Sequence, residues 1–352
     1  MTNQQRVAIV GYGLAGSVFH APLVAATEGL ALTAVVTSNP GRAQQARTSF
    51  EGVEIYPSVD ALWAAAHDID LVVVATPNRD HAPLAHAAIS AGIAVVVDKP
   101  FAVTVGEAES VIEAAAARGV LLSVFQNRRW DGDFLTLQRL LAEGALGDVT
   151  RFESRFERWR PAPKGGWRES GSISDAGGLL FDLGAHLIDQ ALQLFGPVMQ
   201  VYAEVDRRRL GVQSDDDVFI ALTHAGGVRS ELWCSAVASD LGPRLRVLGT
   251  RAAYVKYGLD VQEDALRRGS RPDLDAAWGV ESPDQWGTLG VPGETSAVAT
   301  EPGAYQRYYE GIAAALRGEG PAPVDPRDSV EGLRIIEAAR RSDDERRVVS
   351  LT

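Results

Sequence analysis

The chain has 352 residues, more than one compact core usually takes, so we expect two domains. Its composition, 46% hydrophobic and 23% charged, is ordinary for a soluble globular protein. The formal net charge of -12 argues against a nucleic acid or an anionic membrane as the main partner, since both require a basic surface.

The first residues, MTNQQRVAIVGYG, lead directly into an apolar strand and lack the apolar core of a signal peptide. No apolar run approaches the roughly 20 residues that span a bilayer. Cys234 is the only cysteine, which excludes a disulfide framework, and we expect it to be buried. No His/Cys/Asp pattern suggests zinc, and we predict no metal. We therefore predict a cytoplasmic protein.

The first third of the chain alternates short apolar runs with helix-patterned segments. Near-continuous Val/Ile/Leu runs are typical of parallel strands covered on both faces. We predict an α/β domain, a doubly wound parallel sheet of the Rossmann type, over residues 1–124. The expected strands cover residues 6–10, 30–37, 70–76, 93–98 and 119–125, and clear helices cover 82–92 and 105–119.

The segment VAIVGYGLAGSV places Gly11, Gly13 and Gly16 in G-x-G-x-x-G spacing after the first strand. Such glycines allow a tight turn, close approach to a pyrophosphate and helix–strand packing. The following helix offers free N–H groups to the phosphates. A plain glycine-rich turn is the alternative. We predict a dinucleotide site that includes Tyr12 and Leu14, and we expect Pro22 to kink or shorten the helix.

The end of the second strand indicates which dinucleotide binds. An NAD site usually has a carboxylate there, but this chain has Thr37, Ser38 and Asn39, followed by Arg42. A hydroxyl and a guanidinium suit a 2′-phosphate. NADP(H) is therefore favoured and NAD(H) is possible, with Ser38 and Arg42 as contacts. Alternatively, Arg42 is simply a solvent-exposed helix residue.

The segment IAVVVDKPFAVT places Asp98 and Lys99 where a parallel strand stops. Ligands in such folds bind beyond the carboxyl ends of the strands. Pro100 biases Lys99 towards an extended conformation, which lets its side chain reach outward. A charged turn without a function is the alternative.

Residues 125–352 have a different pattern, and we predict a second, α+β domain built on a sheet with one free face. We expect the Arg207–Arg209 run to be a solvated edge and the Asp215–Asp217 run to be a solvated turn. The expected strands cover 148–159, 198–208, 217–224, 228–237, 243–249 and 252–258; helices cover 133–144, 304–318 and 328–342; and residues 270–296 are expected to form a long ordered loop.

The segment GGLLFDLGAHLIDQ places Asp182 and His186 four residues apart. On a helix this spacing puts both side chains on one face. They could be an acid–base pair, or they could be a helix-face contact with no catalytic role.

Together these three stretches resemble the Gfo/Idh/MocA family of NAD(P)-dependent oxidoreductases. The family's E-K-P motif is similar to Asp98-Lys99-Pro100, with a conservative change at its first position. Its G-G-x-x-x-D-x-x-x-H motif resembles the segment from Gly177 to His186 without a gap. The resemblance implies a large, mostly antiparallel open sheet in the second domain. The segments VFQNRRWDGDF, GGWRES and WGVESPDQWG look like the subgroup that includes NADP-dependent scyllo-inositol dehydrogenases.

The resemblance also implies roles for individual residues. His186 would be the base that takes the hydroxyl proton, and Lys99 would stabilise the developing alkoxide. Asp182 would bind substrate hydroxyls or orient the imidazole. Gly177 and Gly178 would let the backbone pass close to cofactor and substrate. Further cofactor contacts would be Thr76, Pro77, Asn78, His81, Asp98 and Lys99, and the substrate would contact Lys99, Arg128, Trp130, Trp167, Asp182 and His186.

We therefore predict an NADP-dependent oxidoreductase that transfers a hydride between the nicotinamide and a secondary alcohol of a cyclic polyol or sugar. Two alternatives remain open: an NAD-dependent glycosidase of the same fold and a non-catalytic, dinucleotide-binding regulator. We expect a homodimer or homotetramer that assembles through the C-terminal sheet, with no nucleic-acid or membrane partner.

Overall fold

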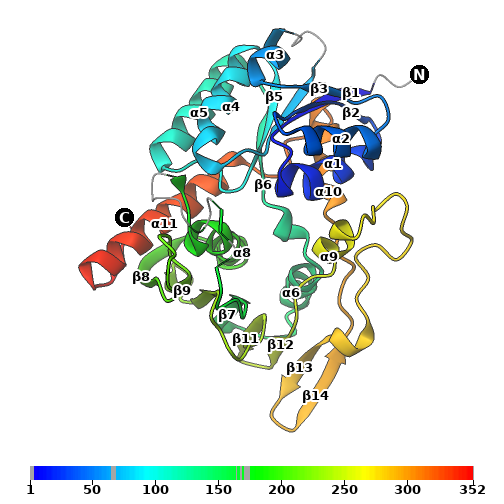
Figure 1. The fold of residues 1–352 in the computed structure, drawn as a ribbon. Helices are drawn as coiled ribbons and strands as arrows, with labels where there is room; N and C mark the ends of the chain where they lie inside the picture. Colours follow the sequence, from blue (N-terminus) through cyan, green and yellow to red (C-terminus); the bar gives the residue numbers. More distant parts are fainter. Residues whose placement is uncertain (1–3, 65–68, 164, 167–168, 170–174, 352) are drawn as a thin grey trace. The chain divides into compact units, whose positions relative to one another are not determined.

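A computed structural model describes residues 4–64, 69–163, 165–166, 169 and 175–351. The chain forms two compact units, whose elements are labelled in Figure 1. The predicted domains are continuous in sequence, whereas each compact unit combines three segments. The first unit combines residues 1–127, 262–278 and 304–330, and the second combines 128–261, 279–303 and 331–352.

The first unit is built on a six-stranded sheet in the order β3-β2-β1-β4-β5-β6. Every pairing in it is parallel. This is the doubly wound order, so the Rossmann prediction is confirmed. The short β3 was not expected, because its three residues carry no buried apolar run. The strands are β1 (Gln5–Val10), β2 (Leu30–Val36), β3 (Glu54–Tyr56), β4 (Leu71–Val74), β5 (Ala94–Asp98) and β6 (Leu122–Phe125).

Helices cover both faces of this sheet, which explains the continuous apolar strands. In Figure 1, α4 (His81–Ser90) and α5 (Val105–Arg118) lie on one side, and α1 (Ala21–Ala25) and α10 (Gln306–Leu316) lie on the other. Three shorter or peripheral helices complete the unit: α2 (Pro40–Ser49), α3 (Val59–Ala64) and α9 (Gln262–Arg267).

Local sequence signals set the ends of α5. The Thr104 hydroxyl accepts a hydrogen bond from the Glu107 N–H, and the Glu107 carboxylate accepts one from Val103. The pair resembles a capping box, except that the carboxylate accepts from the residue before the N-cap Thr104. The helix ends at Gly119, whose φ of 64° is left-handed.

The helix after the glycine turn begins with a π-helical segment, η1 (Ala15–His20), and continues as the five-residue α1. Pro22 lies in α1, which continues η1 directly, and it has no N–H to donate to the preceding turn. The expected disturbance at Pro22 therefore takes the form of a short α-helix after a π-helical start.

The second unit contains a nine-stranded sheet in the order β14-β13-β12-β11-β7-β10-β9-β8-β15. Among the described strands of this sheet, only β7 and β10 pair in parallel, so the predicted large, mostly antiparallel sheet is confirmed. The strands are β7 (Val149–Glu157), β8 (Val198–Asp206), β9 (Asp217–His224), β10 (Arg229–Ser235), β11 (Leu245–Gly249), β12 (Ala253–Lys256), β13 (Gly287–Val291), β14 (Glu294–Val298) and β15 (Val349–Ser350). The main helices are α6 (Gly132–Ala142), α8 (Ala185–Phe195) and α11 (Pro326–Glu345).

The predicted long loop over residues 270–296 is wrong at its C-terminal end. Residues from Gly287 onward form the β13–β14 hairpin, which projects at the edge of the sheet (Figure 1). Most side chains of these strands are exposed, so they show no apolar pattern. The hairpin is held by the pairing of β13 with β12, a contact that no local pattern reveals. Within the described ranges, no helix combines the length and apolarity needed to cross a membrane.

Candidate active site

In the first unit, the glycine turn is shaped by close packing against β4. Gly11 has a φ of 97°, and a Cβ there would lie 2.5 Å from the carbonyl oxygen of Ala75. A Cβ on Gly16 would overlap the carbonyl of Gly11. Gly13, by contrast, has no atom within 4 Å of such a Cβ. Two positions of the motif are therefore filled by protein, and the third leaves space for a ligand.

This open position fits the phosphates of a dinucleotide. The helix that begins after Leu14 has no acidic residue in its first turn, so its positive end is not neutralised locally. Leu14 is 43% exposed, whereas Tyr12 is buried. Burial raises the pKa of Tyr12 to about 12.

The residues predicted to select NADP lie just after β2, the neighbour of β1 in the sheet. Asn39 begins α2, and its side-chain oxygen accepts a hydrogen bond from the Arg42 N–H at 3.0 Å. Ser38 and Arg42 are both exposed. No acidic residue lies in the first turn of α2. The arrangement therefore presents a hydroxyl and a guanidinium without a competing carboxylate.

His81 links the ends of β4 and β5. Its Nδ1 lies 2.8 Å from the carbonyl oxygen of Pro100, and its Nε2 lies 3.0 Å from that of Thr76. The ring is fully buried, and burial lowers the pKa of His81 despite the nearby Asp98 carboxylate. The imidazole therefore connects two segments of the protein. One is Thr76–Asn78, which follows β4, and the other is Lys99–Pro100, which follows β5.

Asp98 and Lys99 lie at the carboxyl end of β5. The Asp98 side chain is buried, with one oxygen 3.5 Å from His20 Nε2, while Lys99 is partly exposed. Burial alone would raise the pKa of Asp98, but contact with His20 and the charges of His20, Lys99 and His81 lower it. The strands β1, β4 and β5 are adjacent and parallel, so their carboxyl ends lie on the same side. The glycine turn, Thr76–Asn78 and Lys99 therefore lie together at the carboxyl-terminal end of the sheet.

In the second unit, Asp182 and His186 lie on one continuous helical segment. Asp182 belongs to a π-helical turn, η6 (Leu180–Gly184), and the buried His186 lies in the first turn of α8. The predicted helix is therefore present, but it begins as a π-helix, a feature often found at functional sites.

Asp215, which the sequence analysis placed in a solvated turn, holds the start of this helix. Its Oδ2 accepts a hydrogen bond from Leu180 N at 2.7 Å, and its carbonyl oxygen accepts one from Leu179 N at 3.0 Å. Gly178 has a φ of 94°, and a Cβ there would overlap the Asp215 carboxylate. Gly178 thus makes room for this carboxylate, which gives a reason for the glycine other than the expected approach of a ligand.

The prediction of a solvated turn at Asp215–Asp217 is wrong for its first two residues. Asp215 is 8% exposed and Asp216 is 1% exposed. Burial raises the pKa of Asp215, while the Leu180 hydrogen bond and Arg340, 3.6 Å away, oppose the rise. One feature of the sequence could have indicated their burial. The two carboxylates directly precede the alternating strand β9, whose first apolar residue is buried.

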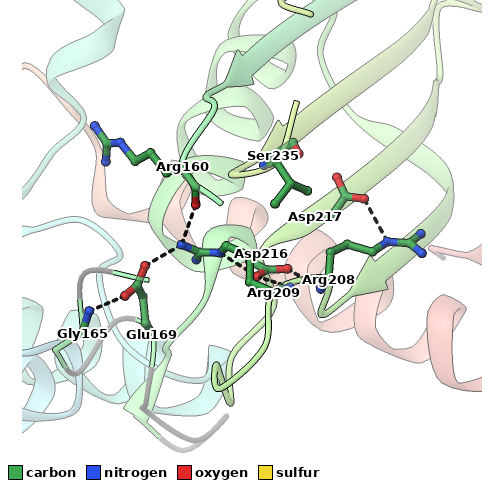
Figure 2. A network of polar contacts seen from close by, with 9 residues as sticks. Arg160, Gly165, Glu169, Arg208, Arg209, Asp216, Asp217 and Ser235 are labelled. Atoms are coloured by element: carbon green, nitrogen blue, oxygen red, sulfur yellow. Dashed lines mark hydrogen bonds and ion pairs between the residues drawn. The ribbon is translucent and has the colours of Figure 1, made fainter. Parts of the chain in front are cut away.

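The prediction of a solvated edge at Arg207–Arg209 is wrong for Arg209, whose side chain is 5% exposed. Figure 2 shows its guanidinium between two carboxylates, at 2.8 Å from Asp216 and 2.9 Å from Glu169. Arg208 remains half-exposed and pairs with Asp217. Two carboxylates from separate segments compensate the burial of Arg209, which a local charge run does not reveal.

The predicted substrate residue Arg128 lies beside the helix of His186. Its guanidinium pairs with Asp131 at 3.4 Å and covers the Phe156 ring at 4.6 Å. Its carbonyl oxygen accepts a hydrogen bond from Gln190, one turn after His186. Trp130 is partly exposed, and Trp167 lies outside the described residues. The second unit thus brings Arg128, Asp182 and His186 to neighbouring elements.

Comparisons with family models show the family to which the chain belongs. The oxidoreductase-family model for an NAD-binding Rossmann fold matches residues 5–126, and the model for that family's C-terminal alpha/beta domain matches residues 138–351. The chain belongs to the Gfo/Idh/MocA family. The resemblance expected from the three motifs is confirmed, and with it an enzyme of the nicotinamide-dependent dehydrogenase type.

Two bacterial relatives and a solved structure match nearly the whole chain. The chain is 38% identical to the scyllo-inositol 2-dehydrogenase (NADP(+)) IolW of Bacillus subtilis, over 98% of this chain and 96% of the relative. It is 41% identical to the uncharacterised oxidoreductase YdgJ of Escherichia coli, over 96% of each. The solved structure of yvaA from Bacillus subtilis matches with a TM-score of 0.93 and 36% identity, over 100% of this chain and 99% of that one.

Proposed function

We propose that this Gfo/Idh/MocA oxidoreductase is an NADP-dependent dehydrogenase that acts on a secondary alcohol of a cyclic polyol, of the inositol type, or of a sugar. The proposal rests on two observations. In the first unit, Lys99 follows β5 at the carboxyl-terminal end of the sheet, and in the second unit one helical segment carries Asp182 and His186. A protein that only bound the dinucleotide would not need these three residues.

The reaction removes a hydride from carbon and a proton from oxygen. When bound, the nicotinamide supplies the carbon that accepts the hydride. We assign the proton to His186, since an imidazole accepts a proton near neutral pH. Lys99 stabilises the negative charge that develops on the substrate oxygen. Asp182 accepts hydrogen bonds from neighbouring hydroxyls, and the same residues act in reverse during ketone reduction.

Contacts around α8 support a fixed position for the helix that carries His186. The Arg129 guanidinium donates to both oxygens of Asp189, at 2.9 Å and 2.6 Å, one turn further along α8. Gln190 adds its bond to the Arg128 carbonyl oxygen. Such a bidentate pair restrains both partners, and a restrained helix limits the loss of reactive geometry.

A spectrophotometric screen at the NADPH absorbance tests the proposed activity. Purified protein is mixed with NADP⁺ or NAD⁺ and a panel of inositols, sugars and sugar acids. We expect stoichiometric NADP⁺ reduction with at least one cyclic polyol or sugar. Hydrolysis of a glycoside without net cofactor reduction would indicate the glycosidase, and dinucleotide binding without turnover across the panel would indicate the regulator.

Arg42→Ala tests the proposed cofactor preference. Loss of a charged contact to the 2′-phosphate is expected to raise the KM for NADP⁺ about 10–100-fold and to change the KM for NAD⁺ little. Arg47→Ala is the matched control, because Arg47 is an exposed arginine in the last turn of the same helix. Equal losses with the two cofactors would contradict a 2′-phosphate contact.

We also propose that the chain assembles as a homodimer or homotetramer through its nine-stranded sheet. Aromatic and charged side chains on strands β7, β9 and β10 support this: the Phe219 and Trp233 rings lie 5.2 Å apart, and the Arg155 guanidinium lies 3.9 Å from the Trp233 ring. Trp and Arg are enriched in the central parts of protein interfaces. Light scattering coupled to gel filtration measures the assembly, and Trp233→Glu is expected to shift it towards monomer.

A further inference from the structure

His20 lies at the point in the first unit where the phosphate-binding helix meets the strand of Lys99. It is the last residue of η1, and its side chain is fully buried. Its Nδ1 lies 2.6 Å from the Tyr309 hydroxyl, and its Nε2 lies 3.5 Å from Asp98 Oδ1. One imidazole therefore connects η1, α10 and β5.

The surroundings of this imidazole are aromatic. The Phe125 ring lies 4.4 Å from the His20 ring, and the Tyr309 ring meets it edge-on at 6.1 Å. A carboxylate buried beside such rings is costly unless a polar partner compensates it. His20 is the residue of this helix that offsets the cost of burying the Asp98 carboxylate. An apolar residue would fill the same space but would not interact with that charge.

The two ring nitrogens of His20 face different groups. Nδ1 lies within hydrogen-bond distance of the Tyr309 hydroxyl, and Nε2 is the nitrogen that faces the Asp98 carboxylate. Burial raises the pKa of Tyr309 well above its ordinary value. The charged or titratable groups that face Asp98 are His20, Lys99, His81 and Tyr309.

We propose that His20 is a positioning residue for Lys99: it holds the Asp98 carboxylate at the end of β5 and joins that strand end to the helix of the phosphate-binding turn. The proposal rests on the catalytic role proposed for Lys99. It also gives Asp98 an internal role, as the link between His20 and the adjacent lysine.

A measurement on Lys99 itself tests the proposal without any substrate. The chain contains three lysines, Lys99, Lys164 and Lys256, so ¹³C-dimethylation gives few NMR signals, which lysine-to-arginine variants can assign. His20→Asn keeps a polar group near Tyr309 but is too short to reach Asp98. It leaves the buried carboxylate without its partner and favours its protonated form. We expect the pH titration of the Lys99 signal to move to lower pH, because a neighbouring negative charge is lost.

Conservative and control variants separate positioning from packing. His20→Gln places an amide N–H where Nε2 lies, and we expect it to restore most of the Lys99 midpoint. Asp98→Asn should lower the midpoint as His20→Asn does, and the double variant should add little to either. His86→Gln is the control, since His86 is partly exposed on α4 and contacts Ser110. It should leave the midpoint unchanged.

Once a substrate is known, kinetics provide a second readout. His20→Asn is expected to lower kcat about tenfold or more and to change the KM for NADP⁺ less than threefold, with partial recovery in His20→Gln. A Lys99 midpoint that is the same in His20→Asn and in the native protein overturns the proposal, whatever the substrate screen finds. If His20→Asn fails to fold, the double variant with Asp98→Asn decides: recovery of folding supports the proposal, and continued failure overturns it.

Discussion

Replacement of His186 by alanine is expected to lower kcat by about 10²–10⁴-fold, the range that a general base contributes. The loss follows because no base would then take the hydroxyl proton as the hydride leaves. Cofactor affinity should change little, since His186 lies outside the unit that carries the phosphate-binding turn. Steady-state kinetics with NADP⁺ and the substrate from the screen measure kcat, and protein fluorescence measures cofactor binding.

Gln193→Ala is the matched control for this variant, because Gln193 is exposed on the same helix, two turns after His186. It should keep kcat within about twofold, as exposed substitutions usually do. Lys99→Ala should also lower kcat strongly, through loss of alkoxide stabilisation. Retention of native kcat in His186→Ala would show that another group accepts the proton, and the assigned mechanism would be wrong.

Gly178→Ala is expected to reduce both stability and activity. The left-handed backbone costs about 1–2 kcal/mol for a residue with a Cβ, and overlap with the Asp215 carboxylate adds about 1–3 kcal/mol. Relief of the overlap would displace Asp215 from Leu180 N and loosen the π-helical turn that carries Asp182. We therefore expect a lower melting temperature together with a fall in kcat that exceeds tenfold. Differential scanning fluorimetry and the NADPH assay measure the two effects.

Gly227→Ala is the control that measures the cost of a left-handed backbone without steric overlap. Gly227 has a φ of 87° in the β9–β10 turn, but no atom lies within 4 Å of an added Cβ. It should cost about 1–2 kcal/mol of stability and leave kcat unchanged. If the overlap causes the effect, Gly178→Ala should be less harmful in an Asp215→Ala background. Strictly additive effects would contradict the role given to Asp215.

Asp215 and Asp216 connect the candidate site to the rest of the second unit. Asp215 holds the start of the Asp182 helix, and Asp216 accepts from Arg209, which also binds Glu169 (Figure 2). Adjacent carboxylates thus join three segments that are separate in sequence. Asp215 supports the start of the helix that carries Asp182 and His186, and Asp216 anchors the buried Arg209.

Several properties of this oxidoreductase were readable from the chain alone, because they are local. Apolar runs that alternate with helical segments predicted the parallel sheet, since a strand covered on both faces must be apolar throughout. The spacing of Gly11, Gly13 and Gly16 predicted a phosphate-binding turn, since side chains at these positions would prevent close packing and close approach of the backbone to a pyrophosphate. The motifs around Lys99 and His186 indicated the family, which the family models confirm.

Other properties were decided only by tertiary structure. Arg209 and Asp215 belong to charge runs that locally resemble solvated turns, but each is buried with a partner from a distant segment. Arg209 pairs with Glu169, and Asp215 accepts a hydrogen bond from the Leu180 N–H. The β13–β14 hairpin exists because β12 offers an edge for pairing, although its own side chains are exposed. His20 is a polar residue in a mostly apolar helical segment, and only folding brings Asp98 and Tyr309 close to its two ring nitrogens. Compensation of buried charge depends on residues far apart in sequence, so no local pattern encodes it.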